Sequence, residues 1–223
     1  AAYPENIMLS EWSNPEQSLS AGFNIDLLIH NGIGGKVYRP LVCETTDKMV
    51  PTVCYFNRKG NGQVRAAMEQ YTEIYNTYRR IGGYASMPTN SHDIWRRTRM
   101  NRTSADAQKV AITLFLTLPT PPIVYYGEEI GMRNLEYAPA KEGSVSSRNR
   151  SVCRTPMQWS TEKNAGFSTA DPAKLYLPVD NALQFPNVAE QLSDPNSVLN
   201  YVKALLALRK ATPALGVEGE WKY

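Results

Sequence analysis

The segment YASMPTNSHDIWR, residues 84–96, is a short apolar run that leads into a histidine, an aspartate and an arginine. The run at residues 84–87 has the length of a buried strand and is followed at once by a proline. Charged and polar side chains in a cluster are costly to bury in a core. The segment therefore predicts a strand whose end carries a site for a polar ligand.

Two other segments of the chain have the same form. The apolar run at residues 7–9 is followed by Glu11, and the run at residues 123–126 is followed by Glu128 and Glu129. In a parallel α/β barrel, the C-terminal ends of the strands carry the functional residues. The three segments together predict a parallel sheet with acidic side chains along one edge.

Helices are expected between these strands. The region 63–81 has apolar residues at spacings of three and four, with two arginines in its last turn and two glycines after it. Further helices are expected to start at Asn14-Pro15, to run from Ser104 to residue 118, and to run from Asp194-Pro195 to residue 210.

Other regions give weaker signals. Three glycines in residues 31–35 predict a loop, and residues 37–57 favour extended structure without a definite topology. The region 133–195 lacks strong periodicity, and its aromatic residues favour an ordered, functional loop. Residues 216–223 are expected to open a further strand.

The alternation of strands and helices indicates an α/β fold with a parallel sheet and crossover helices. Four strands are expected, at residues 7–9, 22–29, 84–87 and 123–126, whereas a closed barrel needs eight. The chain is therefore interpreted as half a barrel and as a piece of a longer protein. Because half a barrel leaves sheet edges uncovered, we expect it to associate with itself or with a missing N-terminal half.

Composition excludes several classes of partner. Of 223 residues, 42% are hydrophobic and 20% are charged, and the net charge of +3 gives no basis for binding nucleic acid. No apolar segment reaches the length of a membrane span, so no membrane partner is expected. Cys43, Cys54 and Cys153 form no CxxC pair, which argues against a disulfide framework and a structural zinc site.

Four motifs resemble those of glycoside hydrolase family 13, the α-amylase family, and they occur in the family's order. Residues 90–96, NSHDIWR, resemble the Asn-x-His-Asp-x-x-Arg motif. Residues 122–132, PIVYYGEEIGM, look like the eighth-strand motif, and residues 9–12, LSEW, resemble the fifth-strand motif. Residues 154–159, RTPMQW, followed by AGF at 165–167, look like a loop of the α-glucosidase-like branch.

The resemblance implies an α/β fold of the (β/α)8 TIM-barrel type. This chain would be its C-terminal half, strands five to eight, plus the start of a C-terminal β-domain. Residues 1–212 would form the half-barrel, with a long loop at about 133–195, and residues 213–223 would begin the β-domain. The family's nucleophilic aspartate lies in a Gly-x-Arg-x-Asp pattern that this sequence does not contain. The chain by itself is therefore expected to be inactive.

The resemblance assigns roles to two carboxylates. Retaining glycosidases use two carboxyl groups about 5–5.5 Å apart, one as nucleophile and one as acid/base. Glu11 would be the catalytic acid/base. Asp93 would be the third carboxylate, which binds the sugar hydroxyls beside the reacting carbon and favours the distorted ring of the transition state. On local sequence alone, Glu11 would be an exposed glutamate before a helix cap and Asp93 a turn cap.

Four further residues are implied in binding substrate. His92 would donate a hydrogen bond to the same sugar hydroxyls, Arg96 would hold a carboxylate or a sugar hydroxyl, and Arg154 would reach the substrate from the long loop. Trp95 would stack on a sugar face. The alternatives are surface positions for the arginines and a core position for the tryptophan. This chemistry requires no cofactor and no metal ion, and the sequence shows no metal-ligand spacing.

The favoured hypothesis is a fragment of a retaining glycoside hydrolase that cleaves α-glucosidic bonds in α-linked glucose oligosaccharides. One alternative is a non-catalytic family relative that acts as a scaffold, and another is an unrelated sugar-binding module. The favoured hypothesis requires the carboxyl groups of Glu11 and Asp93 to face one cleft. The sequence does not determine linkage, chain-length preference or the cellular compartment.

Overall fold

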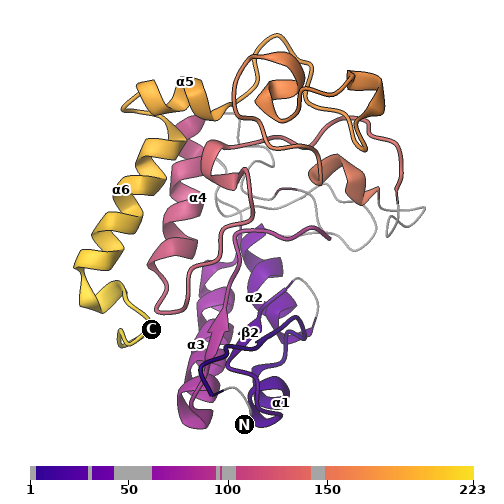
Figure 1. Cartoon of the computed structure of the whole chain (residues 1–223). Helices are drawn as coiled ribbons and strands as arrows, with labels where there is room; N and C mark the ends of the chain where they lie inside the picture. The colour runs from indigo at the N-terminus through magenta and orange to yellow at the C-terminus, as the bar shows by residue number, and fades with distance from the viewer. Residues whose placement is uncertain (1–3, 30–31, 43–61, 94–95, 97–103, 142–148) are drawn as a thin grey trace. The chain divides into compact units, whose positions relative to one another are not determined.

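The computed structural model describes residues 4–29, 32–42, 62–93, 96, 104–141 and 149–223 (Figure 1). The chain divides into two compact units, and each is described by itself. Unit 1 comprises residues 1–88, 114–123 and 209–223, and unit 2 comprises residues 89–113 and 124–208.

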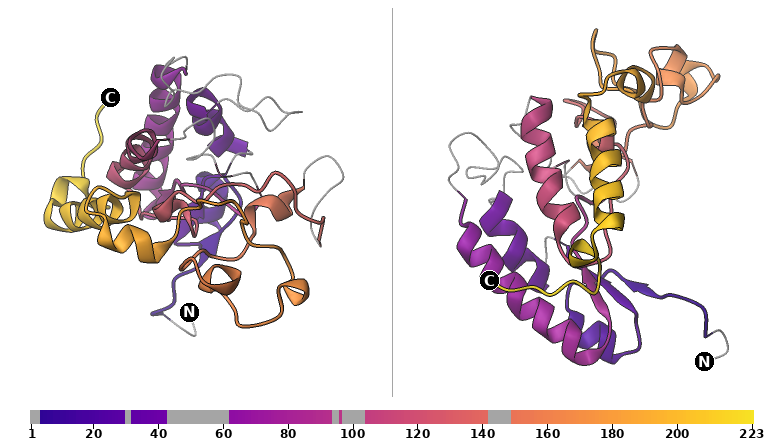
Figure 2. Two further views of the ribbon diagram at one scale, coloured as in Figure 1. Left: turned by 90° about the horizontal axis from the view of Figure 1, so that it is seen from above. Right: turned by 90° about the vertical axis from the view of Figure 1, so that its left-hand side faces the viewer.

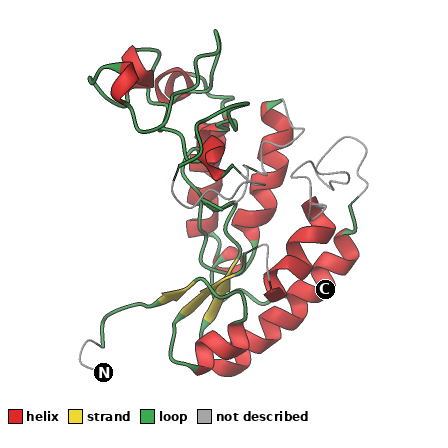
Figure 3. Ribbon diagram, turned by 90° about the vertical axis from the view of Figure 1, so that its right-hand side faces the viewer, coloured by secondary structure: helices red, strands yellow, loops and turns green. Residues whose placement is uncertain are grey.

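Unit 1 contains a three-stranded parallel sheet, drawn as arrows in Figure 3. Its strands are β1 (Leu9–Ser10), β2 (Ile25–Leu27) and β3 (Tyr84–Ser86). They are neighbours in the sheet in chain order, with Leu9 paired with Ile25 and Ile25 paired with Tyr84. The parallel sheet and three of the four expected strands are therefore confirmed.

Three helices lie in the two crossovers between these strands, as parallel pairing requires. They are α1 (Pro15–Ser20), α2 (Gly32–Val42) and α3 (Val64–Ile81). α3 contacts both α1 and α2, and it buries Tyr71 and Tyr78 completely. Gly82, with φ of 93°, ends α3 in the left-handed conformation that glycine allows. The expected start of α1 at Asn14-Pro15 and the expected extent of α3 are confirmed.

The glycine-rich region that was expected to be a loop is the start of a helix. α2 includes residues 32–35 and continues into the region for which extended structure was expected. The glycines allow close packing: a Cβ at Gly34 would lie 2.4 Å from the carbonyl oxygen of Ile29 and 2.5 Å from Oγ of Ser13. Tertiary packing has thus overridden the low helix propensity of glycine. Residues 43–57 of the expected extended region lie outside the described residues.

Residues 123–126 do not form the expected fourth strand in the described structure. Pro121-Pro122, just before them, have no backbone N–H to donate to a ladder. Backbone groups of residues 121–125 form hydrogen bonds with side chains of the segment that contains and follows β3. Within unit 1, Ser86 Oγ donates to the carbonyl oxygen of Pro121 at 2.6 Å. Within unit 2, the backbone N–H of Tyr125 donates to Thr89 Oγ1 at 3.0 Å.

The C-terminal residues 216–223 pack on α3 and do not form the expected strand. The indole of Trp221 meets the ring of Tyr71 edge-on at 5.1 Å, and its Nε1 donates to Thr72 Oγ1 at 2.8 Å. Glu218 forms an ion pair with Arg79 at 2.8 Å. A β-domain that begins at residue 213 remains a prediction.

Unit 2 consists of helices and a long irregular segment. The helices are α4 (Ala105–Thr117), α5 (Val188–Ser193) and α6 (Val198–Ala211), of which α4 and α6 end in unit 1. α4 and α6 lie side by side (Figures 1 and 2), and Thr113 Oγ1 is 2.7 Å from the hydroxyl of Tyr201. Ser104 caps α4 as expected. α6 begins later than expected, at Val198, because Asp194 ends α5.

The segment 133–195, described apart from residues 142–148, is largely irregular, as expected. Besides α5 it contains the 3₁₀ turns η2 (Arg150–Cys153), η3 (Lys163–Gly166) and η4 (Pro172–Lys174), and η1 (Glu128–Ile130) precedes it. Among the described helices, none combines the length and the apolar character that crossing a bilayer would require.

The turn that carries Glu11 is held by a buried carboxylate from the neighbouring strand. Asp26 in β2 has no exposed surface. Its Oδ1 accepts hydrogen bonds from Ser10 Oγ at 2.6 Å, from the Trp12 N–H at 3.3 Å and from the Ser13 N–H at 3.2 Å. These three donors lie on both sides of Glu11. Asp26 therefore fixes the path of the chain around the exposed glutamate.

We expect Asp26→Ala to lower the free energy of unfolding by about 3 kcal/mol, because three donors would lose their acceptor inside the protein. Asp26→Asn retains an oxygen acceptor and should have a smaller effect. Urea unfolding followed by circular dichroism measures both. Glu69→Ala, on the exposed face of α3, is the control and should have little effect. Equal stabilities of Asp26→Ala and Glu69→Ala would show that the carboxylate does not hold the turn.

Candidate functional site

The residues after β3 form a tight polar turn that exposes two side chains. Asn90 Oδ1 accepts the N–H of Ser91 at 2.8 Å, and Ser91 Oγ accepts the N–H of Asp93 at 3.2 Å. Short polar side chains favour such local bonds over a regular ladder, which explains why the chain turns here. His92 and Asp93 consequently face outward, with 53% and 28% of their side chains exposed.

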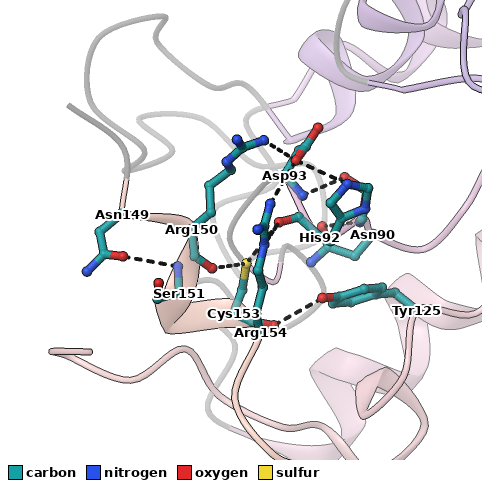
Figure 4. A network of polar contacts seen from close by, with 10 residues as sticks. Asn90, His92, Asp93, Tyr125, Asn149, Arg150, Ser151, Cys153 and Arg154 are labelled. Atoms are coloured by element: carbon teal, nitrogen blue, oxygen red, sulfur yellow. Dashed lines mark hydrogen bonds and ion pairs between the residues drawn. The ribbon is translucent and has the colours of Figure 1, made fainter. Parts of the chain in front are cut away.

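Three cationic or potentially cationic groups surround the Asp93 carboxylate (Figure 4). His92 Nε2 lies 3.3 Å from Oδ1 of Asp93, and Arg154 Nη2 donates to the same oxygen at 3.1 Å. Arg150 Nη1 also forms a hydrogen-bonded ion pair with Oδ1. The arginine side chains are only 22% and 25% exposed. Ion pairs of this kind are screened less by water than surface pairs are.

The two arginines are placed by the 3₁₀ turn η2. Asn149 caps this turn by accepting the N–H of Ser151 at 3.0 Å. Arg150 and Arg154 stand four residues apart, at the start of the turn and just after it, and both reach Asp93. Arg154 Nε also donates to the carbonyl oxygen of His92 at 2.8 Å. The turn is therefore tied to both the backbone and the side chain of the 92–93 segment.

Arg96 follows the polar turn at residues 90–93 in the chain and has no exposed side-chain surface. Its guanidinium donates to the carbonyl oxygens of Tyr126 at 2.5 Å and Cys153 at 3.3 Å, and it lies 3.5 Å from Oε1 of Glu128. It also faces the ring of Tyr125 at 5.0 Å. The sequence led us to expect a carboxylate or a sugar hydroxyl as its partner. In the structure its partner is the carboxylate of Glu128, and it has no exposed surface from which to reach a sugar.

Glu128 is equally buried and takes part in the same arrangement. Asn90 Nδ2 donates to its Oε1 at 3.3 Å, so the pair with Arg96 is also linked to the turn before Asp93. The next residue, Glu129, is half-buried, and burial raises the pKa of its carboxyl. Among the described residues, the contacts to the Asp93 carboxylate come from His92, Arg150 and Arg154 and from neither glutamate.

Burial also perturbs the neutral groups that surround Arg96. It raises the pKa of the Cys153 thiol to about 11 and raises the pKa of the Tyr125 hydroxyl. Both groups are therefore protonated and uncharged at neutral pH. Cys153 Sγ lies 3.1 Å from the carbonyl oxygen of Arg150, and the Tyr125 hydroxyl donates to the carbonyl oxygen of Cys153 at 3.2 Å. These contacts are structural and leave no reactive thiolate at the site.

Glu11 belongs to unit 1 and is exposed at the end of β1. It lines an open cavity of about 490 Å³ together with Trp12, Gln17 and Phe23. The predicted convergence of Glu11 and Asp93 on one cleft remains a prediction. Trp95, which was predicted to stack on a sugar, lies outside the described residues.

Arg150 is the contact to Asp93 that sequence analysis missed. The sequence shows that Arg150 and Arg154 are four residues apart. This spacing predicts a shared contact with Asp93 only when the turn η2 between them is known. Arg154, in contrast, was selected from its motif. In the structure it meets Asp93 and the His92 carbonyl.

We expect Glu128→Gln to lower the free energy of unfolding by about 3 kcal/mol, because it leaves the charge of Arg96 buried without a partner. Arg96→Met should have an effect of similar size, and the double variant should lose less than the sum, as a double-mutant cycle in urea would measure. Glu16→Gln, in an exposed pair with Arg80 at 3.2 Å, is the control and should have little effect. Additive losses would contradict the coupling.

Comparison with known proteins agrees with the motifs. Residues 51–218 match the family model for the α-amylase catalytic domain. The chain is 40% identical over 108 residues to a trehalose synthase/amylase of Mycobacterium tuberculosis, covering 47% of this chain and 16% of that protein. It is 31% identical over 172 residues to a probable α-glucosidase of Rhizobium meliloti, covering 71% of this chain and 30% of that protein. The chain thus spans less than a third of the length of these relatives.

A solved structure shows the fold. The trehalose-6-phosphate hydrolase of Bacillus licheniformis superposes with a TM-score of 0.72 at 19% identity, covering 95% of this chain and 41% of that chain. Together with the family model, this supports a (β/α)8 fold, of which the chain contains a part. The chain belongs to the α-amylase family, glycoside hydrolase family 13.

Proposed function

We propose that this chain contributes strands five to eight of the catalytic barrel of a retaining α-glucosidase-type enzyme. The observation that carries the proposal is the Asp93 carboxylate, partly exposed after β3 and held by His92, Arg150 and Arg154. A carboxylate anchored by several donors is suited to binding sugar hydroxyls in a fixed orientation. Family membership gives this arrangement its chemical context.

In the proposed mechanism Glu11 is the acid/base. It protonates the leaving glycosidic oxygen and then, as a base, activates the water that hydrolyses the glycosyl-enzyme. The nucleophilic aspartate would come from a part of the barrel outside this chain, since the sequence contains no Gly-x-Arg-x-Asp pattern. Asp26 supports this role for Glu11 by fixing Ser10 and Trp12 on either side of it.

Asp93 and His92 would act on the sugar itself. Asp93 would accept hydrogen bonds from the hydroxyls beside the reacting carbon, and these bonds would strengthen as the ring distorts toward the oxocarbenium-like transition state. His92 would donate to the same hydroxyls. Arg96 would act indirectly, through Glu128 and two backbone carbonyls, and would not touch the substrate.

The substrate we propose is an α-linked glucose oligosaccharide. Similar proteins include a probable oligo-1,6-glucosidase of Bacillus subtilis, which is 34% identical over 131 residues, and the probable α-glucosidase of Rhizobium meliloti. Trehalose synthases are also among the similar proteins. An assay should therefore score both released glucose and rearranged disaccharide.

We expect Glu11→Gln, in the full-length protein that contains this chain, to lower kcat on maltose by roughly a hundredfold to ten-thousandfold, because general acid catalysis is lost. An α-glucoside with an acidic aryl leaving group needs less protonation and should be less affected. Initial rates of glucose and aryl alcohol release measure the two effects.

The matched control is Glu5→Gln, an exposed glutamate in the same N-terminal segment. It should leave both rates unchanged. If Glu11→Gln turned over maltose at the unaltered rate, Glu11 would not be the acid. If the unaltered full-length protein bound maltose without turnover, the non-catalytic alternative would replace this proposal.

A further inference from the structure

We propose that Arg150 is a positioning residue for the reaction, which fixes the Asp93 carboxylate so that only one of its oxygens is offered to the sugar. The inference rests on the proposed function of Asp93. It adds a residue that lies outside the four motifs on which the family resemblance rests.

The contacts to Asp93 are all on one side of its carboxylate. His92 Nε2, Arg150 Nη1 and Arg154 Nη2 meet Oδ1, and no described residue bonds to Oδ2 (Figure 4). Three contacts to a single oxygen oppose rotation of the carboxylate about its Cβ–Cγ bond. Oδ2 is therefore the oxygen available to a sugar hydroxyl, and it is held in one direction.

Arg150 and Arg154 hold different atoms of this segment. Arg154 divides its donors between Asp93 Oδ1 and the carbonyl oxygen of His92, so it orients the backbone as well as the side chain. Arg150 is directed at the carboxylate: among the described residues, its guanidinium forms its hydrogen-bonded ion pair with Asp93. Loss of Arg150 should therefore disturb the carboxylate while the backbone stays in place.

Arg150 is itself held firmly. The Asn149 cap and the contact from Cys153 Sγ to the Arg150 carbonyl fix the backbone of η2. The guanidinium Nε is buried and has no hydrogen-bond partner among the described residues, so the side chain has lost water on that side. A desolvated, restrained arginine interacts more strongly with a carboxylate than a mobile surface arginine does. This distinguishes Arg150 from a surface charge that happens to lie near Asp93.

The consequence for catalysis is a specific kinetic effect. A carboxylate held in the direction of the transition-state hydroxyls loses catalytic power when it can rotate, even though it still binds the ground-state sugar. The effect should therefore fall on kcat more than on KM. A residue needed only for stability would lower the amount of folded enzyme. It would leave kcat per folded molecule and KM unchanged.

The experiment compares variants in the full-length protein. Arg150→Leu should lower kcat on an α-glucoside about ten- to a hundredfold with KM changed less than about threefold, since displacement of a positioned group by about 1 Å has effects of this size. Arg150→Lys should recover part of the loss, because it restores a donor without the planar fork. Guanidinium chloride at a concentration far below denaturation should rescue an Arg150→Ala variant.

The matched control is Arg133→Leu. Arg133 is another partly buried arginine of unit 2, paired with Asp180 at 2.7 Å, and it does not contact Asp93. It should lose stability without a change in kcat per folded molecule and without rescue by guanidinium. Thermal unfolding gives the folded fraction of each variant.

The outcomes separate this inference from the proposed function. An unchanged kcat in Arg150→Leu, together with inactivation by Asp93→Asn, would overturn the role of Arg150 and leave the proposed function intact. Full activity in Asp93→Asn would overturn the proposed function itself. Equal rescue by guanidinium in the Arg150→Ala and Arg133→Leu variants would reduce Arg150 to a structural residue.

Discussion

A guanidinium without any exposed surface has to replace its water with a carboxylate and several oxygen acceptors, because an unpaired buried charge is costly. Arg96 meets this requirement at its two Nη atoms, with Glu128 and with the carbonyl oxygens of Tyr126 and Cys153, while its buried Nε has no hydrogen-bond partner among the described residues. These partners come from stretches that are 30 or more residues away along the chain. Satisfying one buried charge therefore fixes three segments together, and Asp93 stands only three residues before Arg96. The arrangement of the site follows from this constraint.

Burial decreases from this pair outward. Arg96 and Glu128 have no exposed side-chain surface, Arg150 and Arg154 are about one quarter exposed, and His92 is half exposed. Electrostatic attraction weakens as water approaches, so the inner pair holds the architecture, the two arginines hold the Asp93 carboxylate, and the more exposed His92 can meet a ligand. Groups oriented before a ligand arrives need little reorganisation during the reaction, which is the condition for effective transition-state stabilisation.

The sequence was most informative where a residue's role depends on its neighbours along the chain. The end of α3 at Gly82 and the polar turn after β3 could be predicted because the necessary residues are adjacent. The helix from Gly32 could not, since its glycines are explained by contacts with Ser13 and Ile29. Arg96 was recognised as functional from its motif, but its complete burial depends on residues 126–128 and 153. A pattern of neighbouring residues in the sequence does not predict contacts with residues this far along the chain.

Both units contain a buried ionisable group that is linked to the segment carrying a proposed site acid. In unit 1, Asp26 accepts hydrogen bonds from the turn that carries Glu11, and in unit 2 the pair of Arg96 and Glu128 is linked through Asn90 to the turn that carries Asp93. The buried groups are explained by stability alone, so a scaffold that had lost its chemistry would still need them. Glu11 is different, because a carboxylate that is exposed at the end of a strand contributes little to folding. Stability alone therefore does not explain Glu11, and this is why we propose a catalytic role for it in preference to a scaffold.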